Sequence, residues 1–488
     1  MIYTFTTVDN VHRGSYNYRM LLVLAILLAP PSSSAAETPS NALPRFERAA
    51  CPVEVAPDER IDCGALFVPE NRDQSGSRAI RLPVMIFRSR SSSPAPDPLV
   101  FITGGPGNSS VAGRRSGKEI PFLDDRDVIV LEQRGTRFAQ PSLECPEINR
   151  IKGEIAAGRL RGNAANAALI AAAKECRKTL VASGVDLDGY TTAAYADDLE
   201  DLRKLLGYEK WNLHGLSYGT RVALTVLRRH PAGVRSVVLD SVLPPEVNFD
   251  EVSAANLLRA LGVVFDGCAI DRDCSAATPN ARERFRELVA RADRNPLPLE
   301  VDADVRGAQV VDAIYSALHS PKAIPQIPRI IANAGSGNYD ALKQLVKENL
   351  GPSRSTWGLR LSVWCAEEMP FENPERVASQ VSPSLGLGGI DEGTATPALC
   401  RAWNVKAAPA IENEPVKSDV PALIFAGEFD PDTPPEWGRS LLDSMPNARY
   451  VEFRGRSHGA GFNRCGTEIV TAFLRAPSAP LPVDCALR

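Results

Sequence analysis

Several features that would direct a chain of 488 residues toward a particular partner are scarce or missing. Its 55 Lys and Arg residues are matched by 59 Asp and Glu residues, so the formal net charge is only −4. Nucleic acids and anionic membrane surfaces select proteins with basic patches or a large basic excess. The charge balance therefore argues against both as the main partner.

Patterns that hold metals and nucleotide cofactors are missing too. None of the ten cysteines stands in a Cys-x-x-Cys pair, the spacing of many zinc and thiol-redox sites. No Lys-Ser or Lys-Thr pair follows the Gly-rich loop at 103–109, so it lacks the phosphate-loop pattern. Gly386, Gly388 and Gly389 do not complete a dinucleotide fingerprint. We therefore expect no metal and no cofactor.

The apolar run at 20–30 is shorter than the roughly 20 residues that a membrane span needs. Arg13 and Arg19 precede it, and small residues at 34–36 follow it, which is the pattern of a secretory signal peptide. The alternative is a short anchoring helix. We expect a signal peptide over residues 1–36, no transmembrane span in the mature chain, and a periplasmic or extracellular protein.

The remaining composition, 44% hydrophobic and 23% charged, is typical of folded proteins. Between residues 51 and 245, short apolar runs alternate with amphipathic helical patterns, a sign of an open α/β sheet. Continuous apolar runs suit strands buried on both faces of a mostly parallel sheet. Such runs lie at 99–102, 128–131, 211–214 and 234–239.

Helical periodicity then dominates from residue 246 to about 415, with the clearest patterns at 253–266, 281–294, 308–319, 322–333 and 339–349. Strand-like runs return at 422–425 and 450–453. The pattern predicts an α/β domain in two parts, 37–245 and 416–488, interrupted by a helical block over 246–415.

The sequence Gly-Leu-Ser-Tyr-Gly at 215–219 stands directly between a predicted strand and a predicted helix. In that context Gly-x-Ser-x-Gly is a nucleophile turn, because the glycines permit the sharp bend that lifts Ser217 above the sheet. The second oxyanion donor in such sites comes from a loop after an earlier strand. We expect the backbone N–H groups of Tyr218 and Gly105 to form the oxyanion hole.

A serine needs a base and an orienting carboxylate. Only five histidines exist. His458 follows the last predicted strand, whereas the other four lie in the leader, inside a strand or at helix ends: His12, His214, His230 and His319. The order Ser…Asp…His then favours Asp430 as the acid. Asp432 in the same loop and Asp240 at the end of 234–239 remain rivals.

These motifs, with Gly-Gly-Pro-Gly at 104–107, Gln-Arg-Gly-Thr at 133–136 and Asp-Pro-Asp-Thr-Pro at 430–434, resemble the α/β-hydrolase family of serine aminopeptidases. That family includes proline iminopeptidases and secreted tripeptidyl aminopeptidases. The resemblance implies an α/β-hydrolase fold, a mostly parallel central sheet with flanking helices and a large helical cap, and a Ser217–His458–Asp430 triad. The chain departs from the family at Glu132 and Arg137, where Asp and Gly are usual, and Arg134 is expected to tie loops together.

The resemblance also implies an acidic group for the free amine of a peptide. Trp-Cys-Ala-Glu-Glu at 364–368 is similar to the cap segment that supplies it, which makes Glu367 and Glu368 the predicted amine-binding residues. The expected partners are thus peptide substrates with a free N-terminus, and the expected enzyme is an exported serine aminopeptidase. A carboxylesterase for small acyl esters is the alternative, and a non-catalytic binding protein on the same scaffold is a third possibility.

Export favours disulfides. Pairing cysteines that are neighbours in sequence closes five short segments, although sequence alone does not determine connectivity. The expected bridges are Cys51–Cys63, Cys145–Cys176, Cys268–Cys274, Cys365–Cys400 and Cys465–Cys485.

Overall fold

The computed structural model describes residues 42–118, 120–350, 355–380 and 396–487. Two units can be distinguished, Met1–Ala42 and Leu43–Arg488, and everything below concerns the second. The predicted signal peptide, residues 1–36, lies outside the described residues.

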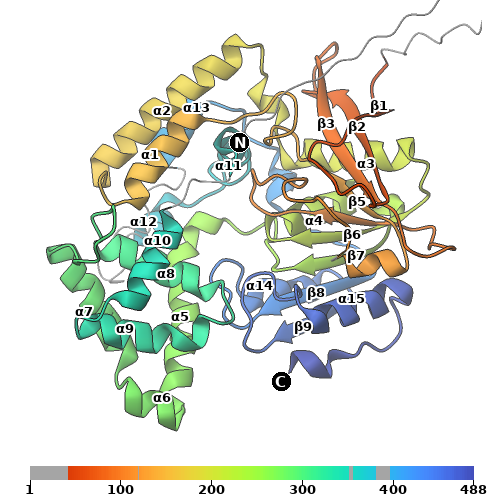
Figure 1. Cartoon of the computed structure of the whole chain (residues 1–488). Helices are drawn as coiled ribbons and strands as arrows, with labels where there is room; N and C mark the ends of the chain where they lie inside the picture. The colour runs from red at the N-terminus through yellow and green to blue at the C-terminus, as the bar shows by residue number, and fades with distance from the viewer. Residues whose placement is uncertain (1–41, 119, 351–354, 381–395, 488) are drawn as a thin grey trace, which may run out of the picture. The chain divides into compact units, whose positions relative to one another are not determined.

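A mostly parallel sheet organises this unit, with the strand order β1-β2-β3-β5-β4-β6-β7-β8-β9 among the described residues (Figure 1). The pairs β1–β2, β2–β3 and β3–β5 are antiparallel, and the others are parallel. The strands are β1 (Arg45–Arg48), β2 (Ile61–Pro69), β3 (Ala79–Phe87), β4 (Leu99–Ile102), β5 (Val128–Leu131), β6 (Trp211–Leu216), β7 (Val234–Asp240), β8 (Ala422–Gly427) and β9 (Ala448–Phe453).

Both faces of the sheet are buried, which explains the continuous apolar runs. In β5, Ile129 and Leu131 face one core cluster, whereas Val128 and Val130 face the other. The first cluster is completed by α3 (Thr192–Leu205) and α4 (Tyr218–Arg229), and the second by α15 (Arg464–Arg475). Figure 1 shows α15 beside β8 and β9.

The helical block has a core of its own. Its apolar cluster joins α5 (Ser253–Ile270), α7 (Ala281–Arg294), α8 (Gly307–Leu318), α9 (Ile327–Gly335) and α10 (Asp340–Asn349). The short helix α6 (Arg272–Ala277) follows α5. These helices match the amphipathic patterns of the sequence, because each presents one apolar face to the others.

A second group of helices packs differently. The hairpin α1 (Pro146–Ala156) and α2 (Gly162–Ala182), which periodicity did not reveal, packs with α11 (Trp357–Glu367) and α13 (Pro397–Trp403) in the cluster of the sheet. The hairpin also contacts the cap, since the Asp304 N–H donates to the Ala157 carbonyl at 2.7 Å. The helices that pack here thus include α1 and α2, which lie outside the range 246–415 predicted for the helical block. The remaining helices are α12 (Pro374–Gln380) and α14 (Pro435–Ser440).

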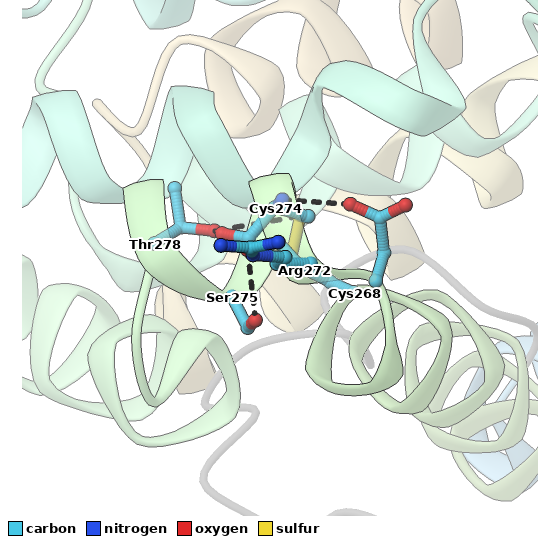
Figure 2. Close-up of a disulfide and its surroundings, with 6 residues drawn as sticks. Cys268, Arg272, Cys274, Ser275 and Thr278 are labelled. Atoms are coloured by element: carbon cyan, nitrogen blue, oxygen red, sulfur yellow. Dashed lines mark hydrogen bonds between the residues drawn. A yellow bond between two sulfur atoms is a disulfide. The ribbon is translucent and has the colours of Figure 1, made fainter.

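Five disulfides join the pairs expected from the sequence: Cys51–Cys63, Cys145–Cys176, Cys268–Cys274, Cys365–Cys400 and Cys465–Cys485. No described cysteine is free. Figure 2 shows the bridge between α5 and α6, where the Thr278 Oγ1 lies 3.2 Å from the Cys268 sulfur and 3.5 Å from the Cys274 sulfur.

Of the described helices, α5 alone is long and apolar enough to cross a membrane by length and composition. Half of that helix is buried inside the protein, with Leu257 and Leu261 in the cap core. Such burial is typical of the core helix of a helical domain.

Candidate active site

The nucleophile turn lies between β6 and α4. Ser217 has φ 56° and ψ −127°, a backbone conformation that residues other than glycine rarely adopt, and its side chain is half-buried. A Cβ on Gly215 would lie 2.5 Å from the Gly219 carbonyl oxygen, and one on Gly219 would lie 2.2 Å from the Ile102 carbonyl oxygen. Both glycines are therefore required for the bend that presents the serine at the strand end.

The loop 104–107 covers this turn. A Cβ on Gly104 would lie 2.9 Å from the Ser217 Cβ, so the two backbones are in close contact. Gly105 has φ +131°, which favours glycine. Tyr218 is the first residue of α4, so its N–H has no acceptor within the helix. The two predicted oxyanion donors thus stand on adjoining segments beside Ser217.

Buried charges hold the loop that carries Gly105. The Glu132 carboxylate accepts from the Ser109 hydroxyl at 2.9 Å and from the Ser110 N–H at 2.8 Å. Burial raises the pKa of Glu132, although these hydrogen bonds oppose the rise. On the cap side, Arg360 of α11 donates to the Gly105 carbonyl at 3.3 Å. The loop is therefore fixed from the sheet and from the cap.

His458 and Asp430 come from the loops after β9 and β8. The His458 Nδ1 lies 3.0 and 3.1 Å from the two Asp430 oxygens. Asp430 is fully buried, and its oxygens accept from the Thr433 hydroxyl at 2.7 Å and the Thr433 N–H at 2.9 Å. Burial lowers the pKa of His458, but the charge and hydrogen bond of Asp430 more than offset this and raise it to about 9.

The C-terminal end of β7 connects the Ser217 turn to the loop that carries His458. The Ser217 N–H donates to the Asp240 carbonyl at 3.0 Å, while the Gly459 N–H donates to the Ser241 hydroxyl at 2.8 Å. Two consecutive residues of one strand end thus hold both segments. Among the described residues, the hydrogen bonds of His458 all involve Nδ1. Nε2 is therefore the nitrogen available to take a proton from the serine.

The two rival carboxylates have other partners. Asp240 is fully buried, and its Oδ2 accepts from the Gly461 N–H at 2.9 Å, while burial raises its pKa to about 7. Asp432 lies 3.8 Å from the His458 Nδ1, and it pairs with His319 at 2.8 Å and with the Tyr315 hydroxyl. The contacts at Nδ1 therefore favour Asp430 as the orienting acid.

Asp430, Asp432 and His458 also bring possible metal-ligand atoms within 4.8 Å of one another. The oxygens of both carboxylates already accept hydrogen bonds, from Thr433 in one case and from Tyr315 and His319 in the other. These hydrogen bonds are those expected of a carboxylate that orients a catalytic histidine.

The structure gives both predicted amine-binding glutamates protein partners. Glu367 accepts from the Thr192 N–H at 2.6 Å and from its hydroxyl at 2.5 Å, and burial raises the pKa of Glu367 to about 7. Glu368 forms an ion pair with Arg221 of α4 and accepts from the Phe249 N–H at 2.9 Å. Their role toward a substrate amine stays a prediction, and their visible contacts join α11 to α3 and α4.

Further acidic groups lie close by. A cavity of about 560 Å³ has Asp250 and Glu372 in its wall, together with the Cys365–Cys400 bridge. Burial, with the nearby charges of Asp250 and Glu368, raises the pKa of Glu372 to about 9. The acidic neighbours of Glu372 therefore disfavour its charged form.

Two side chains that lie near His458 were not predicted from the sequence to belong to the site. His319 was set aside because it ends a helix, yet its ring centroid lies 5.9 Å from that of His458. Tyr315 precedes it by four residues, the spacing that puts two side chains on one helix face. That spacing was the available signal, but nothing in the sequence placed it beside the acid loop, because Asp432 lies 113 residues after His319. Arg134, expected to tie loops, is fully buried and bonds Asp198 through two nitrogens at 2.6 and 2.7 Å.

The chain is similar in sequence to known peptidases. The chain is 25% identical to the serine protease Hip1 of Mycobacterium tuberculosis over 460 residues, covering 86% of each protein. It is 24% identical to a tripeptidyl aminopeptidase of Streptomyces lividans over 462 residues, covering 85% of this chain and 81% of the relative. A solved proline iminopeptidase of Mycobacterium smegmatis superposes with a TM-score of 0.37 at 16% identity, over 85% of this chain and 98% of that one.

The relatives named as peptidases confirm the predicted resemblance, and with it the enzyme class, a serine hydrolase of the peptidase type. A family model described as the alpha/beta hydrolase fold matches residues 97–464, which is most of the chain. Since β4, the nucleophile turn, the acid loop and His458 all fall within that match, the chain belongs to the α/β hydrolase fold family.

Proposed function

We propose that this protein is an exported serine aminopeptidase that releases an N-terminal residue or short peptide through an acyl-enzyme. The observation that carries the proposal is the convergence of four strand ends: the Ser217 turn and the His458 loop meet at Asp240–Ser241, and His458 contacts Asp430. Relatives named as a serine protease and as aminopeptidases support a peptide as the substrate.

In this mechanism Ser217 attacks the scissile carbonyl while the His458 Nε2 takes its proton. Asp430 holds the imidazole with Nδ1–H toward itself and stabilises the imidazolium that forms. The N–H groups of Gly105 and Tyr218 stabilise the oxyanion of the tetrahedral intermediate. His458 then protonates the leaving amine, and water releases the acyl group by the same steps in reverse order.

Selection of free N-termini is assigned to acidic residues of the cap. A buried carboxylate facing an ammonium favours a free amine and leaves a blocked terminus without a partner. Glu367 and Glu368 are the residues proposed for this role. Because Glu368 pairs with Arg221 and Glu367 with Thr192, the ammonium would share these carboxylates with protein donors.

Export through a signal peptide over residues 1–36, to the periplasm or the exterior, is part of the proposal. The five disulfides support it, because structural disulfides persist in oxidising compartments.

The test is a panel of reporter substrates given to the purified chain and to Ser217→Ala. It contains aminoacyl and tripeptidyl amides, each with a free and an acetylated N-terminus, and short acyl esters. We expect turnover of the free peptides, at least tenfold slower turnover of the acetylated ones, and no turnover by the variant. Equal rates on free and acetylated peptides would refute the aminopeptidase. Ester turnover without any peptide cleavage would establish the esterase alternative.

A further inference from the structure

The cap reaches the catalytic acid loop through the last turn of α8. Tyr315 and His319 lie four residues apart and both contact Asp432. The Tyr315 hydroxyl donates to one Asp432 oxygen, and the His319 Nε2 lies 2.8 Å from the other. Both oxygens of a carboxylate next to His458 are therefore held by one helix of the cap.

The hydrogen bonds of His319 indicate its charge. Its Nδ1 lies 3.0 Å from the Tyr315 carbonyl oxygen, and its Nε2 faces the Asp432 carboxylate. A carbonyl and an ionised carboxylate only accept hydrogen bonds, so both ring nitrogens must donate, which only the imidazolium can do. In agreement, burial lowers the pKa of His319, but the hydrogen bond and charge of Asp432 outweigh burial and raise it overall.

Two carboxylates, those of Asp430 and Asp432, lie close to the imidazole of His458. Asp430 contacts the His458 Nδ1 at 3.0 Å, and Asp432 lies 3.8 Å from the same atom. Two uncompensated charges at this distance would stabilise the imidazolium in the resting enzyme, so less of His458 would be present as the neutral base near neutral pH. Pairing Asp432 with a cation from the cap removes part of that excess.

Helix α5 holds the backbone of the same loop. Arg259 donates to the Asp430 carbonyl at 2.6 Å and to the Glu428 carbonyl at 3.1 Å, and the Asn256 amide donates to the Asp432 carbonyl at 3.3 Å. The acid loop is thus held by two cap helices, one through carbonyls and one through a carboxylate.

We propose that Tyr315 and His319 are positioning residues: docked on the acid loop, they hold the Asp432 carboxylate and balance its charge, so that Asp430 alone orients His458. The proposal deepens the proposed function and rests on its triad. The ion pair between His319 and Asp432 thereby connects the contact of the cap with the acid loop to the basicity of His458.

The ionisable groups around His458 and Asp432 come from five structural elements. Among the described residues, the charges and ionisable side chains that face His458 and Asp432 are Asp240 at the end of β7, Asp430 after β8, Tyr315 and His319 in the last turn of α8, Arg259 on α5 and Arg360 on α11. Of these, His319 is the cation hydrogen-bonded to the Asp432 carboxylate. Its removal should therefore act on His458 through Asp432.

The test measures the rate at which a fluorophosphonate labels Ser217 in the full chain between pH 5 and pH 10. This readout needs the triad and no particular peptide. His319→Gln keeps a donor but removes the charge, so Asp432 is left uncompensated and the midpoint of the pH profile should rise by about one unit. Asp432→Asn removes the second charge, and its midpoint should fall by a similar amount.

The double variant distinguishes this role from general damage. If His319 acts through Asp432, the midpoint of His319→Gln/Asp432→Asn should equal that of Asp432→Asn alone. Tyr315→Phe, which removes a neutral donor, should shift the midpoint in the same direction as His319→Gln and by less. His230→Gln is the matched control, because His230 pairs with Asp197 at 2.7 Å at the far end of α4, and it should leave the midpoint unchanged.

Unchanged midpoints in both single variants, or shifts in the same direction, would overturn the proposal, since a merely structural role lowers the rate at every pH. Thermal unfolding identifies a variant that fails to fold, and Tyr315→Phe then provides the decisive midpoint. Absence of labelling in the wild-type protein would instead refute the triad. Normal labelling without peptide cleavage would refute the aminopeptidase and leave this inference intact.

Discussion

The strand-end loops of the sheet and helix α11 of the cap both carry buried acidic residues, but those residues have different partners. At the strand ends, Asp430 meets an ionisable group that can exchange a proton, the His458 ring at 3.0 Å. At the C-terminal end of α11, Glu367 meets the N-terminus of α3, and Glu368, which follows the helix, meets the permanent cation of Arg221. A carboxylate held by a titrating partner can take part in proton transfer, whereas one held by a fixed cation or a helix end also stabilises the architecture.

The largest expected effect tests the first half of that comparison. Asp430→Asn keeps the shape of the side chain but removes the charge that orients and stabilises His458. We expect kcat/KM to fall about 10⁴-fold, the size of effect seen when the acid of such a triad is replaced. Far-ultraviolet circular dichroism and the Tm should change little, because the amide can still pack in the same place.

Asp240→Asn is the matched control for Asp430→Asn. Asp240 is equally buried, but its Oδ2 accepts from the Gly461 N–H, which an amide oxygen can also do. Its kcat/KM should therefore fall far less. An inactive Asp240→Asn beside an active Asp430→Asn would reverse the assignment of the acid.

The second prediction concerns stability. Glu368→Gln leaves the Arg221 guanidinium buried without its counter-charge, and both side chains are almost fully buried. Breaking such a pair by removing one partner costs about 3–5 kcal/mol, which urea unfolding would measure. The labelling rate of the folded fraction should stay within a few-fold of wild type. Glu468→Gln, whose partner Arg464 is exposed, is the control and should change stability little.

This outcome separates two roles of the same residue. Glu368 is proposed to bind the substrate amine as well as to pair with Arg221. If Glu368→Gln lowers stability but leaves discrimination between free and acetylated peptides unchanged, Glu368 is architectural only and its proposed role toward the amine is wrong.

The difference between the two regions also explains what could be predicted from the sequence. Strand ends could be located because parallel strands end at one edge of the sheet, and Ser217, Asp430 and His458 were then predicted from the nucleophile motif, the small number of histidines and the order Ser…Asp…His. The partners of Glu367 and Glu368 were not accessible, since Thr192 and Arg221 are about 150 to 175 residues away in the chain. In the hairpin α1–α2, α2 has alanine at half of its buried positions and gives weak periodicity, whereas the isoleucines that α1 buries were a usable signal.

The third prediction is a pH dependence. Burial raises the pKa of Glu367 from 4.5 to about 7, although hydrogen bonds from Thr192 oppose the shift. The folded protein therefore keeps a proton that the unfolded chain loses above pH 4.5. The stability that Glu367 contributes is complete below that pH and is lost as the pH rises through about 7.

Glu367→Gln cannot lose this proton. Between pH 5 and pH 8 the unfolding free energy of the wild type should fall by up to about 3 kcal/mol more than that of the variant. Asp240 and Glu372 also titrate in this direction, but they do so in both proteins and cancel in the difference. Parallel curves for the two proteins would show that Glu367 stays ionised, as a group poised to bind an ammonium should.

The smallest expected effect tests how far the cap communicates with the strand ends. The Cys268–Cys274 bridge spans a sequence separation of 6, so replacing both cysteines by serine should cost only about 2 kcal/mol of stability. The bridge and Phe429, the neighbour of Asp430, lie in the wall of one cavity of about 470 Å³. If the acid loop is held by α5 and α8 through the contacts of Arg259 and His319, loosening the bridge should leave the labelling rate and its pH midpoint unchanged. A shifted midpoint in this variant would mean that packing around the cavity, and not the ion pair alone, sets the basicity of His458.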